Sequence, residues 1–361
     1  VLFRSVEGEI PKDLNGIYLR NGPNPRFAPP GRYHAFDGDG MLHSAAFQDG
    51  TLVYRNRWIH TQAWHEEDRA NEGLYGGIFD TMKGRDDRPL KNSANTDVVG
   101  HAGKALVSWY QSGEAYWVDP LTLETLGKAD FAGLGGGVSA HCKVDEHTRE
   151  LMFFDYGSDA PYMSYGVVDG EGRLKDLIPI PLPGARLPHD MAITEHFSIL
   201  HDLPVVHCEE ALRHGRHKIV FDTSLPTRLG VIPRHGPAGD LRWFEFSPCF
   251  IYHVVNAWEE GSEIVMVGCR YLPRQHADGT LDGPATANDI AQLRMNARLW
   301  EWRMNLATGE ARERCLNADF NVEFPGINLR YQGRPNRWGY LVDHDPKVLR
   351  WTGLRKFDLH S

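Results

Sequence analysis

A short strand–turn–strand pattern recurs along the chain and limits its fold more than any other feature. Each copy has a strand-like run, an Asp or Asn, a tight turn and a second strand-like run. Asp and Asn favour such turns because their side chains bond the neighbouring backbone, and Gly accepts a positive φ. The copies are AYWVDPLTLETLG (115–127), HCKVDEHTRELMFF (141–154), YGVVDGEGRLKD (165–176), WEWRMNLATGEARE (300–313) and GLRKFDLHS (353–361).

Repeated hairpins with almost no helix predict an all-β protein. Their spacing of some tens of residues favours a β-propeller. The best helical candidate is short and covers residues 286–298. A β-sandwich is the alternative, and it is disfavoured because 361 residues are many for one sandwich. We expect a single propeller domain over residues 1–361.

Composition and charge argue against several kinds of partner. The chain is 41% hydrophobic and 24% charged, which is ordinary for a globular protein. Its formal net charge of −9 argues against nucleic acid or an anionic membrane surface. No apolar run is long enough for a transmembrane segment. The five cysteines are odd in number and form no CxxC pair, so we expect reduced thiols in a cytoplasmic protein.

Three of the 18 histidines share one setting, because each starts or lies within a strand that leads into a hairpin. They are His141, His189 and His253, spaced by roughly one propeller blade of about 40–50 residues, with insertions. One residue per blade on the inner strand converges on the central axis. Several neutral imidazoles meeting there would make a metal site. Taken alone, each histidine is more often a core or surface residue, as we interpret His201.

Long motifs of the chain resemble, in order, those of the carotenoid cleavage oxygenase family. The resemblance runs over the whole chain and implies a seven-bladed β-propeller with a ferrous iron, Fe(2+), on its axis. It also implies a dioxygenase that splits a carbon–carbon double bond of a conjugated alkene with O2, which gives two carbonyl products. The motifs are LNGIYLRNGPNPRF (14–27), YHAFDGDGMLH (33–43), SAHCKVD (139–145), PHDMAITEHFSILHDLP (188–204), CFIYHVVNAWEEG (249–261) and VEFPGINLRYQGR (322–334).

In this family four histidines bind the iron, and three of them match His141, His189 and His253. The fourth lies near the family's C-terminus, in a segment that resembles nothing in this chain. We therefore expect on the order of a hundred residues, about two blades, to be missing, which leaves roughly five blades and part of another. His344 lies in a turn-like stretch and His360 at the chain end, and we expect neither to replace the missing ligand.

Family glutamates hold the second ring nitrogen of the ligand histidines, as outer partners of a metal usually do. Glu323 matches one of these glutamates, and we expect it to accept a hydrogen bond from His253. It lies in an apolar strand, where a buried carboxylate needs a partner. Another family glutamate aligns with Gln111. A neutral amide can still accept an N–H bond there, but it brings no charge.

The resemblance also bears on the substrate. The stilbene-cleaving branch has a Lys-Glu pair where this chain has Tyr110 and Gln111, and an upstream Tyr where it has Ile78. The phenol-anchoring groups of that branch are therefore absent, which favours a small hydrophobic, apocarotenoid-like alkene over a stilbenoid. A peripheral membrane contact would serve the uptake of such a substrate. A metal-dependent propeller hydrolase and a non-catalytic binding propeller stay open as alternatives, and metal analysis would separate them.

Overall fold

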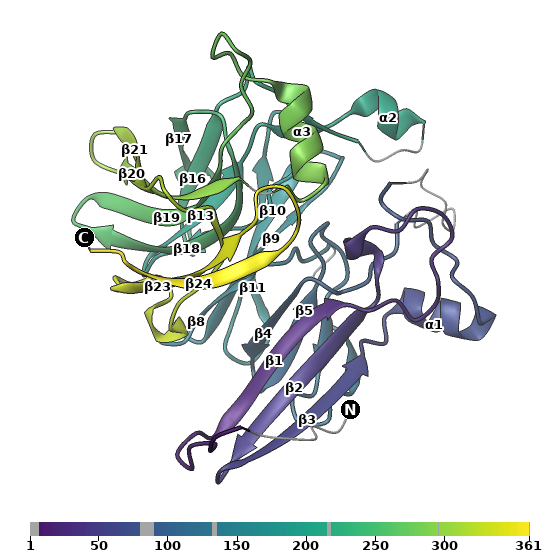
Figure 1. Cartoon of the computed structure of the whole chain (residues 1–361). Coiled ribbons are helices and arrows are strands. Elements are labelled where there is room, and N and C mark those ends of the chain that lie inside the picture. The colour runs from purple at the N-terminus through teal and green to yellow at the C-terminus, as the bar shows by residue number, and fades with distance from the viewer. Residues whose placement is uncertain (1–6, 80–89, 132–135, 215–217, 295, 361) are drawn as a thin grey trace. The chain divides into compact units, whose positions relative to one another are not determined.

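The computed structural model describes residues 7–79, 90–131, 136–214, 218–294 and 296–360 (Figure 1). The chain divides into two compact units, and each is described by itself. Unit 1 comprises Val1–Ala140 and Glu210–His217, and unit 2 comprises His141–Glu209 and Lys218–Ser361. No helix within the described ranges is both long and apolar enough to cross a membrane. The predicted single domain, the cytoplasmic location and the peripheral membrane contact stay predictions.

Unit 1 contains two antiparallel sheets. The first has the order β1-β2-β3 and the second the order β4-β5-β6-β7. Its helical elements are a nine-residue helix, a short 3-10 turn and all but the first residue of α2 (Glu209–Arg213). The bounds are β1 (Gly16–Pro23), η1 (Ala35–Asp37), β2 (Gly40–Gln48), β3 (Thr51–Trp58), α1 (Gln62–Ala70), β4 (Asp97–His101), β5 (Lys104–Ser108), β6 (Tyr116–Val118) and β7 (Thr125–Lys128).

The first two sheets of unit 2 carry strands that begin close to two of the predicted site histidines. Their orders are β11-β10-β9-β8 and β12-β13-β16-β17, and a two-stranded sheet, β14-β15, is inserted into the second. The bounds are β8 (Lys143–Asp145), β9 (Glu150–Tyr156), β10 (Tyr162–Val168), β11 (Leu174–Pro181), β12 (Ala192–Ile193), β13 (Phe197–Asp202), β14 (Val205–His207), β15 (Ile219–Phe221), β16 (Thr227–Pro233) and β17 (Arg242–Phe246); α2 (Glu209–Arg213) follows β14, and η2 (Ala238–Asp240) precedes β17.

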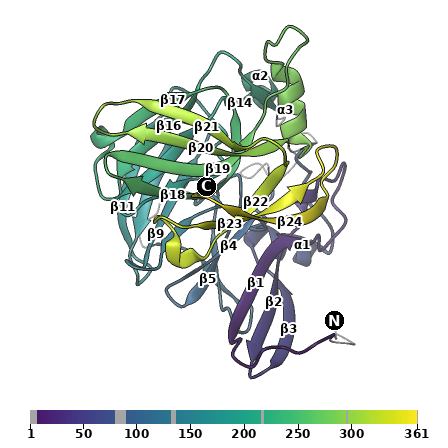
Figure 2. The ribbon, with the colours of Figure 1, turned by 60° about the vertical axis from the view of Figure 1, so that its left-hand side comes forward.

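The remaining sheets of unit 2 are β18-β19-β20-β21 and β22-β23-β24. Figure 2 shows the four strands of the first of these sheets side by side. The bounds are β18 (Phe250–Glu260), β19 (Glu263–Tyr271), α3 (Gly283–Ala291), β20 (Ala297–Asn305), β21 (Ala311–Asn317), β22 (Val322–Gly326), η3 (Leu329–Tyr331), β23 (Trp338–His344) and β24 (Trp351–Asp358).

Four of the five predicted hairpin turns are confirmed, and an Asp or Asn side chain caps each of them. In the fifth copy, residues 353–361, β24 ends at Asp358 and no second strand follows within the described residues. Asp119 Oδ1 accepts the backbone N–H groups of Leu121 and Thr122, each at 2.8 Å, between β6 and β7. Asn305 Oδ1 accepts those of Ala307 and Thr308, each at 2.9 Å, between β20 and β21. The side chain thus accepts hydrogen bonds from backbone N–H groups of the turn that have no partner in the sheet. This explains why the sequence pattern repeats.

Six sheets of three or four antiparallel strands in the described part of the chain form the blades of an all-β propeller. The predicted propeller is confirmed, and no sandwich is formed. The six blades differ from the seven that the resemblance implies. They lie close to the expected five blades and part of another, because two of the six sheets have only three strands.

The predicted helix over residues 286–298 is wrong at both ends. α3 begins earlier, at Gly283, where the Asp282 side chain accepts the N–H of Ala285. It ends at Ala291, and Leu293 has a φ of +54°, which lies outside the right-handed helical region. Ala297 already begins strand β20.

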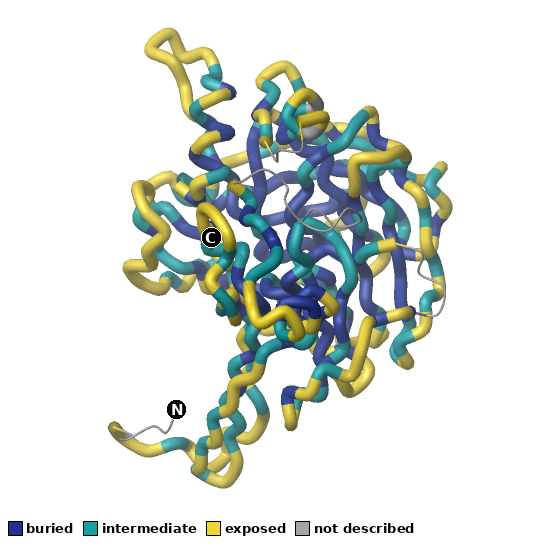
Figure 3. Tube along the Cα trace, turned by 90° about the vertical axis from the view of Figure 1, so that its right-hand side faces the viewer, coloured by how far each residue is buried: buried dark blue, intermediate teal, exposed yellow. Residues whose placement is uncertain are grey.

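Two apolar cores in unit 2 hold the strands that carry the predicted site. One is formed by side chains from β9, β10, β12, β13 and β16, including Phe154, Tyr165 and Ile193. The other joins β18–β20 to β22 and β23, and includes Val255, Val322 and Leu341. In Figure 3 the buried residues, in dark blue, form extended runs of the chain, and the exposed residues, in yellow, lie mostly in the connections. Close packing of this kind resists displacement, so residues at the ends of these strands are held in fixed positions.

Candidate metal centre

The three histidines predicted as ligands are presented by irregular backbone at or near strand ends. His141 precedes β8 and has a φ of +67°, a left-handed conformation that is uncommon for a residue with a side chain. His189 precedes β12. His253 lies within β18, at the register shift between Ile251 and Val254 in its pairing with β19. Such bulges redirect a side chain from the regular alternation of a strand, and they are common beside functional sites.

These histidines converge on one point within unit 2. One nitrogen of each of His141, His189 and His253 lies within 4.8 Å of the corresponding nitrogens of the other two. Their ring centroids are separated by 5.0, 4.9 and 5.2 Å. No other group of three or more potential ligands is found within the residues that the structure describes. Three imidazoles at this separation suit a transition-metal ion, and their role as ligands stays a prediction.

Glu323 lies behind His253. Its Oε2 is 2.5 Å from Nδ1 of His253, and the carboxylate is fully buried. The same oxygen accepts the backbone N–H of Phe324 at 2.6 Å. A bond at Nδ1 leaves Nε2 of His253 as the nitrogen that can bind a metal, which is the usual arrangement around metal-ligating histidines.

Burial and charge act on these imidazoles in different ways. Burial lowers the pKa of His189 well below its usual range, and the neighbouring His141 and His253 lower it further. His189 is therefore neutral near pH 7, which is the form that binds a metal. Burial also opposes the charged form of His253, but the Glu323 carboxylate prevails and raises its pKa.

Two other histidines considered in the sequence lie outside this group. His201 is buried in β13, as its structural interpretation predicted. His344 is the last residue of β23 and is buried, so its placement in a turn is wrong. Its backbone N–H bonds the carbonyl of Asn321 at 2.9 Å, which extends the strand by this residue. Neither belongs to the cluster of potential ligands.

A buried carboxylate lies beside the cluster. Asp190 follows His189 directly and forms an ion pair with Lys143. Lys143 Nζ lies 2.6 Å from Asp190 Oδ1. The sequence held a signal, since Lys143 and Asp145 alternate in the apolar stretch after His141 and therefore share one face of the strand. Charged residues in such a position predict buried partners.

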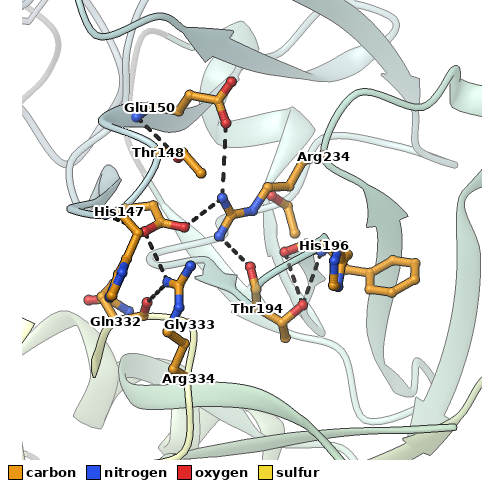
Figure 4. A network of polar contacts seen from close by, with 12 residues as sticks. His147, Thr148, Glu150, Thr194, His196, Arg234, Gln332, Gly333 and Arg334 are labelled. Carbon is orange, nitrogen blue, oxygen red and sulfur yellow. Dashed lines mark hydrogen bonds and ion pairs between the residues drawn. The ribbon is translucent and has the colours of Figure 1, made fainter. Parts of the chain in front are cut away.

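A network of charged and polar side chains that sequence reasoning missed lies in unit 2 (Figure 4). Asp145 is fully buried and pairs with Arg234 at 2.8 Å and with Arg334 at 2.9 Å. Thr194 donates to Glu259 Oε1 at 2.6 Å, and Arg234 also donates to the Thr194 carbonyl. Because the buried Asp145 is paired with two arginines, this network is interpreted as a contribution to the stability of unit 2.

The remaining predicted residues lie in unit 1. Gln111 Nε2 donates to Tyr110 Oη at 2.9 Å, and the predicted role of Gln111 beside a ligand histidine stays a prediction. Ile78, Tyr110 and Gln111 line one cleft. Its other walls combine apolar side chains, such as Phe27 and Trp109, with charged ones, among them Asp37 and Glu67.

The chain matches the family model described as retinal pigment epithelial membrane protein (RPE65) over residues 2–361. It belongs to the carotenoid cleavage oxygenase family. The chain is 36% identical to the carotenoid 9,10(9',10')-cleavage dioxygenase 1 of Pisum sativum, over 99% of this chain and 69% of that protein. It is 32% identical to the isoeugenol monooxygenase of Pseudomonas nitroreducens, over 95% of this chain and 72% of that protein.

Solved structures of carotenoid cleavage oxygenases share the fold. Cobalt-substituted apocarotenoid oxygenase from Synechocystis has a TM-score of 0.82 and 26% identity, and the match covers 99% of this chain and 78% of that one. The lignostilbene dioxygenase of Pseudomonas brassicacearum has a TM-score of 0.81 and 28% identity, over 94% of this chain and 72% of that one. The protein is therefore an oxygenase of the carotenoid-cleavage type, and the hydrolase and binding-propeller alternatives are not favoured.

Proposed function

We propose that the protein is a non-haem Fe(II) dioxygenase that cleaves a carbon–carbon double bond of an apocarotenoid-like alkene. The observation that supports this most is the convergence of His141, His189 and His253, whose nitrogens lie within 4.8 Å of one another. The donor set fits the metal, because imidazole nitrogens suit iron and these three are held by buried strands.

In this account His141, His189 and His253 hold the iron, and Glu323 fixes the ring of His253 through Nδ1. Ferrous iron supplies the electrons with which dioxygen is activated. Glu323 also brings one negative charge toward an otherwise neutral ligand set. No side chain is required as nucleophile or general base, since both oxygen atoms of O2 enter the two carbonyl products.

Three features support a hydrophobic, non-phenolic substrate. Relatives include carotenoid 9,10(9',10')-cleavage dioxygenases, which supports a carotenoid-derived alkene. The cleft of unit 1 is lined by Ile78, Tyr110 and Gln111. By the resemblance, these residues replace the phenol-anchoring groups of the stilbene-cleaving branch. Lys91 also lines the cleft, but Asp39 and Glu67 hold its ammonium at 2.6 and 2.5 Å. That lysine is therefore not available to bind a phenolate.

The experiment that tests this function is product analysis under labelled oxygen. The purified, iron-loaded protein is incubated under ¹⁸O₂ with an apocarotenoid and, separately, with a hydroxystilbene. We expect two carbonyl fragments from the apocarotenoid, each carrying one labelled oxygen, and slower turnover of the stilbenoid. Preferred cleavage of the stilbenoid would overturn the substrate class. Absence of any cleavage by iron-loaded protein would overturn the proposed function.

A further inference from the structure

One buried carboxylate touches all three segments that carry the histidine cluster. Asp190 Oδ1 accepts from Lys143 Nζ at 2.6 Å and from the backbone N–H of Met191 at 2.7 Å. Its Oδ2 accepts the backbone N–H of Val254 at 2.7 Å. The side chain of Asp190 is 2% exposed, so water does not compete for these bonds.

The residues that contact Asp190 lie next to the predicted ligand histidines in the sequence. Lys143 lies two residues after His141, Asp190 follows His189, and Val254 follows His253. Val254 also lies between two register shifts of β18, where the strand departs from regular pairing. A single carboxylate therefore links three chain segments that are far apart in sequence. Each contact lies within one or two residues of one of the three histidines.

The charges of this group balance. The Lys143 side chain is 13% exposed, and its ammonium faces a carboxylate that is almost completely buried. Removing one partner from such a pair leaves an uncompensated charge, which is far more harmful than removing both. An ammonium left without its carboxylate would also repel a metal cation held by the histidines nearby.

We propose that Asp190 is a positioning residue of the metal centre, with Lys143 as the counter-charge that allows it to be buried. The proposal rests on the proposed function, because it takes His141, His189 and His253 as the metal ligands. Asp190 does not bind the metal in this account. It fixes the three backbone segments, so that the imidazoles keep their separation before a metal enters.

Asparagine cannot reproduce the role of Asp190. An amide offers one acceptor oxygen and places an NH₂ donor where the carboxylate has its second oxygen. Three donors, from Lys143, Met191 and Val254, then compete for one oxygen. Asp190→Asn therefore breaks at least one of these hydrogen bonds and also leaves the Lys143 charge unpaired.

Asp145, which lies on β8 with Lys143, offers a matched control. It too is a fully buried carboxylate with cationic partners, Arg234 and Arg334. It differs in that these partners are not adjacent in sequence to the predicted ligands. Asp145→Asn should therefore lower stability, while the histidine cluster keeps its geometry.

The test is a titration with Co²⁺ alone, followed by visible absorption, in parallel with thermal unfolding of each metal-free variant. Titrations are run at a temperature at which circular dichroism shows a folded protein. We expect Asp190→Asn to weaken cobalt binding by about 10–100-fold and to change the cobalt spectrum. Asp145→Asn should lower the melting temperature but leave the cobalt affinity and spectrum close to those of the wild-type protein.

The double variant Lys143→Met/Asp190→Asn keeps the test decisive if Asp190→Asn does not fold, because it removes both buried charges. It should bind cobalt more tightly than Asp190→Asn, because no unpaired ammonium remains. It should bind cobalt more weakly than the wild-type protein, because the hydrogen bonds with the backbone N–H groups of Met191 and Val254 are still weakened. Wild-type cobalt binding by the double variant, or equal losses in Asp145→Asn, would overturn the positioning role. Failure of the folded wild-type protein to bind cobalt would instead count against the proposed function.

Discussion

Glu323 Oε2 lies 2.5 Å from Nδ1 of His253, and both side chains are held away from solvent. A carboxylate in this position orients the imidazole and increases its basicity toward a metal. The contact spans β18 and β22, which pack against each other through the apolar core that contains Val255 and Val322. The geometry of the predicted ligand is therefore tied to the packing of two sheets.

Glu323→Gln should weaken metal binding by about 10–100-fold, because the amide brings no charge and bonds the imidazole less strongly. The measurement is the iron dissociation constant under anaerobic conditions. Glu259→Gln is the matched control, since Glu259 also pairs with a histidine, His196, at 3.0 Å. Equal affinities for the wild-type and Glu323→Gln proteins would make Glu323 a structural residue only.

His189→Ala should abolish iron retention, because it removes one of three converging donors. Elemental analysis of the purified variant measures this directly. His196→Ala removes a histidine of the same motif that is exposed, and it should keep the wild-type iron content. Retention of iron by His189→Ala would show that the metal is held elsewhere.

Substrate choice should respond to the residues that line the cleft of unit 1. Ile78→Tyr combined with Tyr110→Lys and Gln111→Glu introduces groups that bind a phenolate. We expect the ratio of kcat/KM for a hydroxystilbene over an apocarotenoid to rise about tenfold, the effect of one hydrogen bond to a charged group. The same variant with Ile78→Phe lacks only the new hydroxyl. An equal ratio in both triple variants would show that this hydroxyl does not contribute to substrate choice.

Stability in acid should depend on Asp145. Burial opposes its ionisation, but hydrogen bonds from Arg334, the His147 N–H and Arg234 prevail and lower its pKa. The depressed pKa means that Asp145 stabilises the fold fully above the unfolded-state pKa of about 4, and that this contribution is lost as the pH falls through the lower folded value. Urea unfolding from pH 6 to pH 2 should show a smaller loss of stability in Asp145→Asn than in the wild-type protein. Parallel curves for the two proteins would contradict this assignment.

The parts of the fold that depend on neighbouring residues could be predicted from the sequence. Asp119 and Asn305 cap turns through bonds to residues two and three positions ahead, so the hairpins are visible as a local pattern. The histidines were found from their common position before hairpins and from the family motifs.

The contacts of Asp190 with Lys143 and Val254 could not be predicted in the same way. They join residues that are 47 and 64 positions apart, and they depend on where β18 is interrupted by bulges. A bulge is a property of the pairing between two strands, which one strand's sequence does not show. The start of α3 at Gly283 was missed because its cap, Asp282, precedes a Gly-Pro pair that is typical of a turn.

The iron content and metal-dependent product formation of the wild-type protein, measured on one preparation, test the central claim most directly. The account predicts one iron per chain, cleavage of an apocarotenoid into two carbonyl fragments, and loss of both in His189→Ala. A folded wild-type protein that binds no iron, or one that cleaves the alkene equally well after complete metal removal, would contradict it.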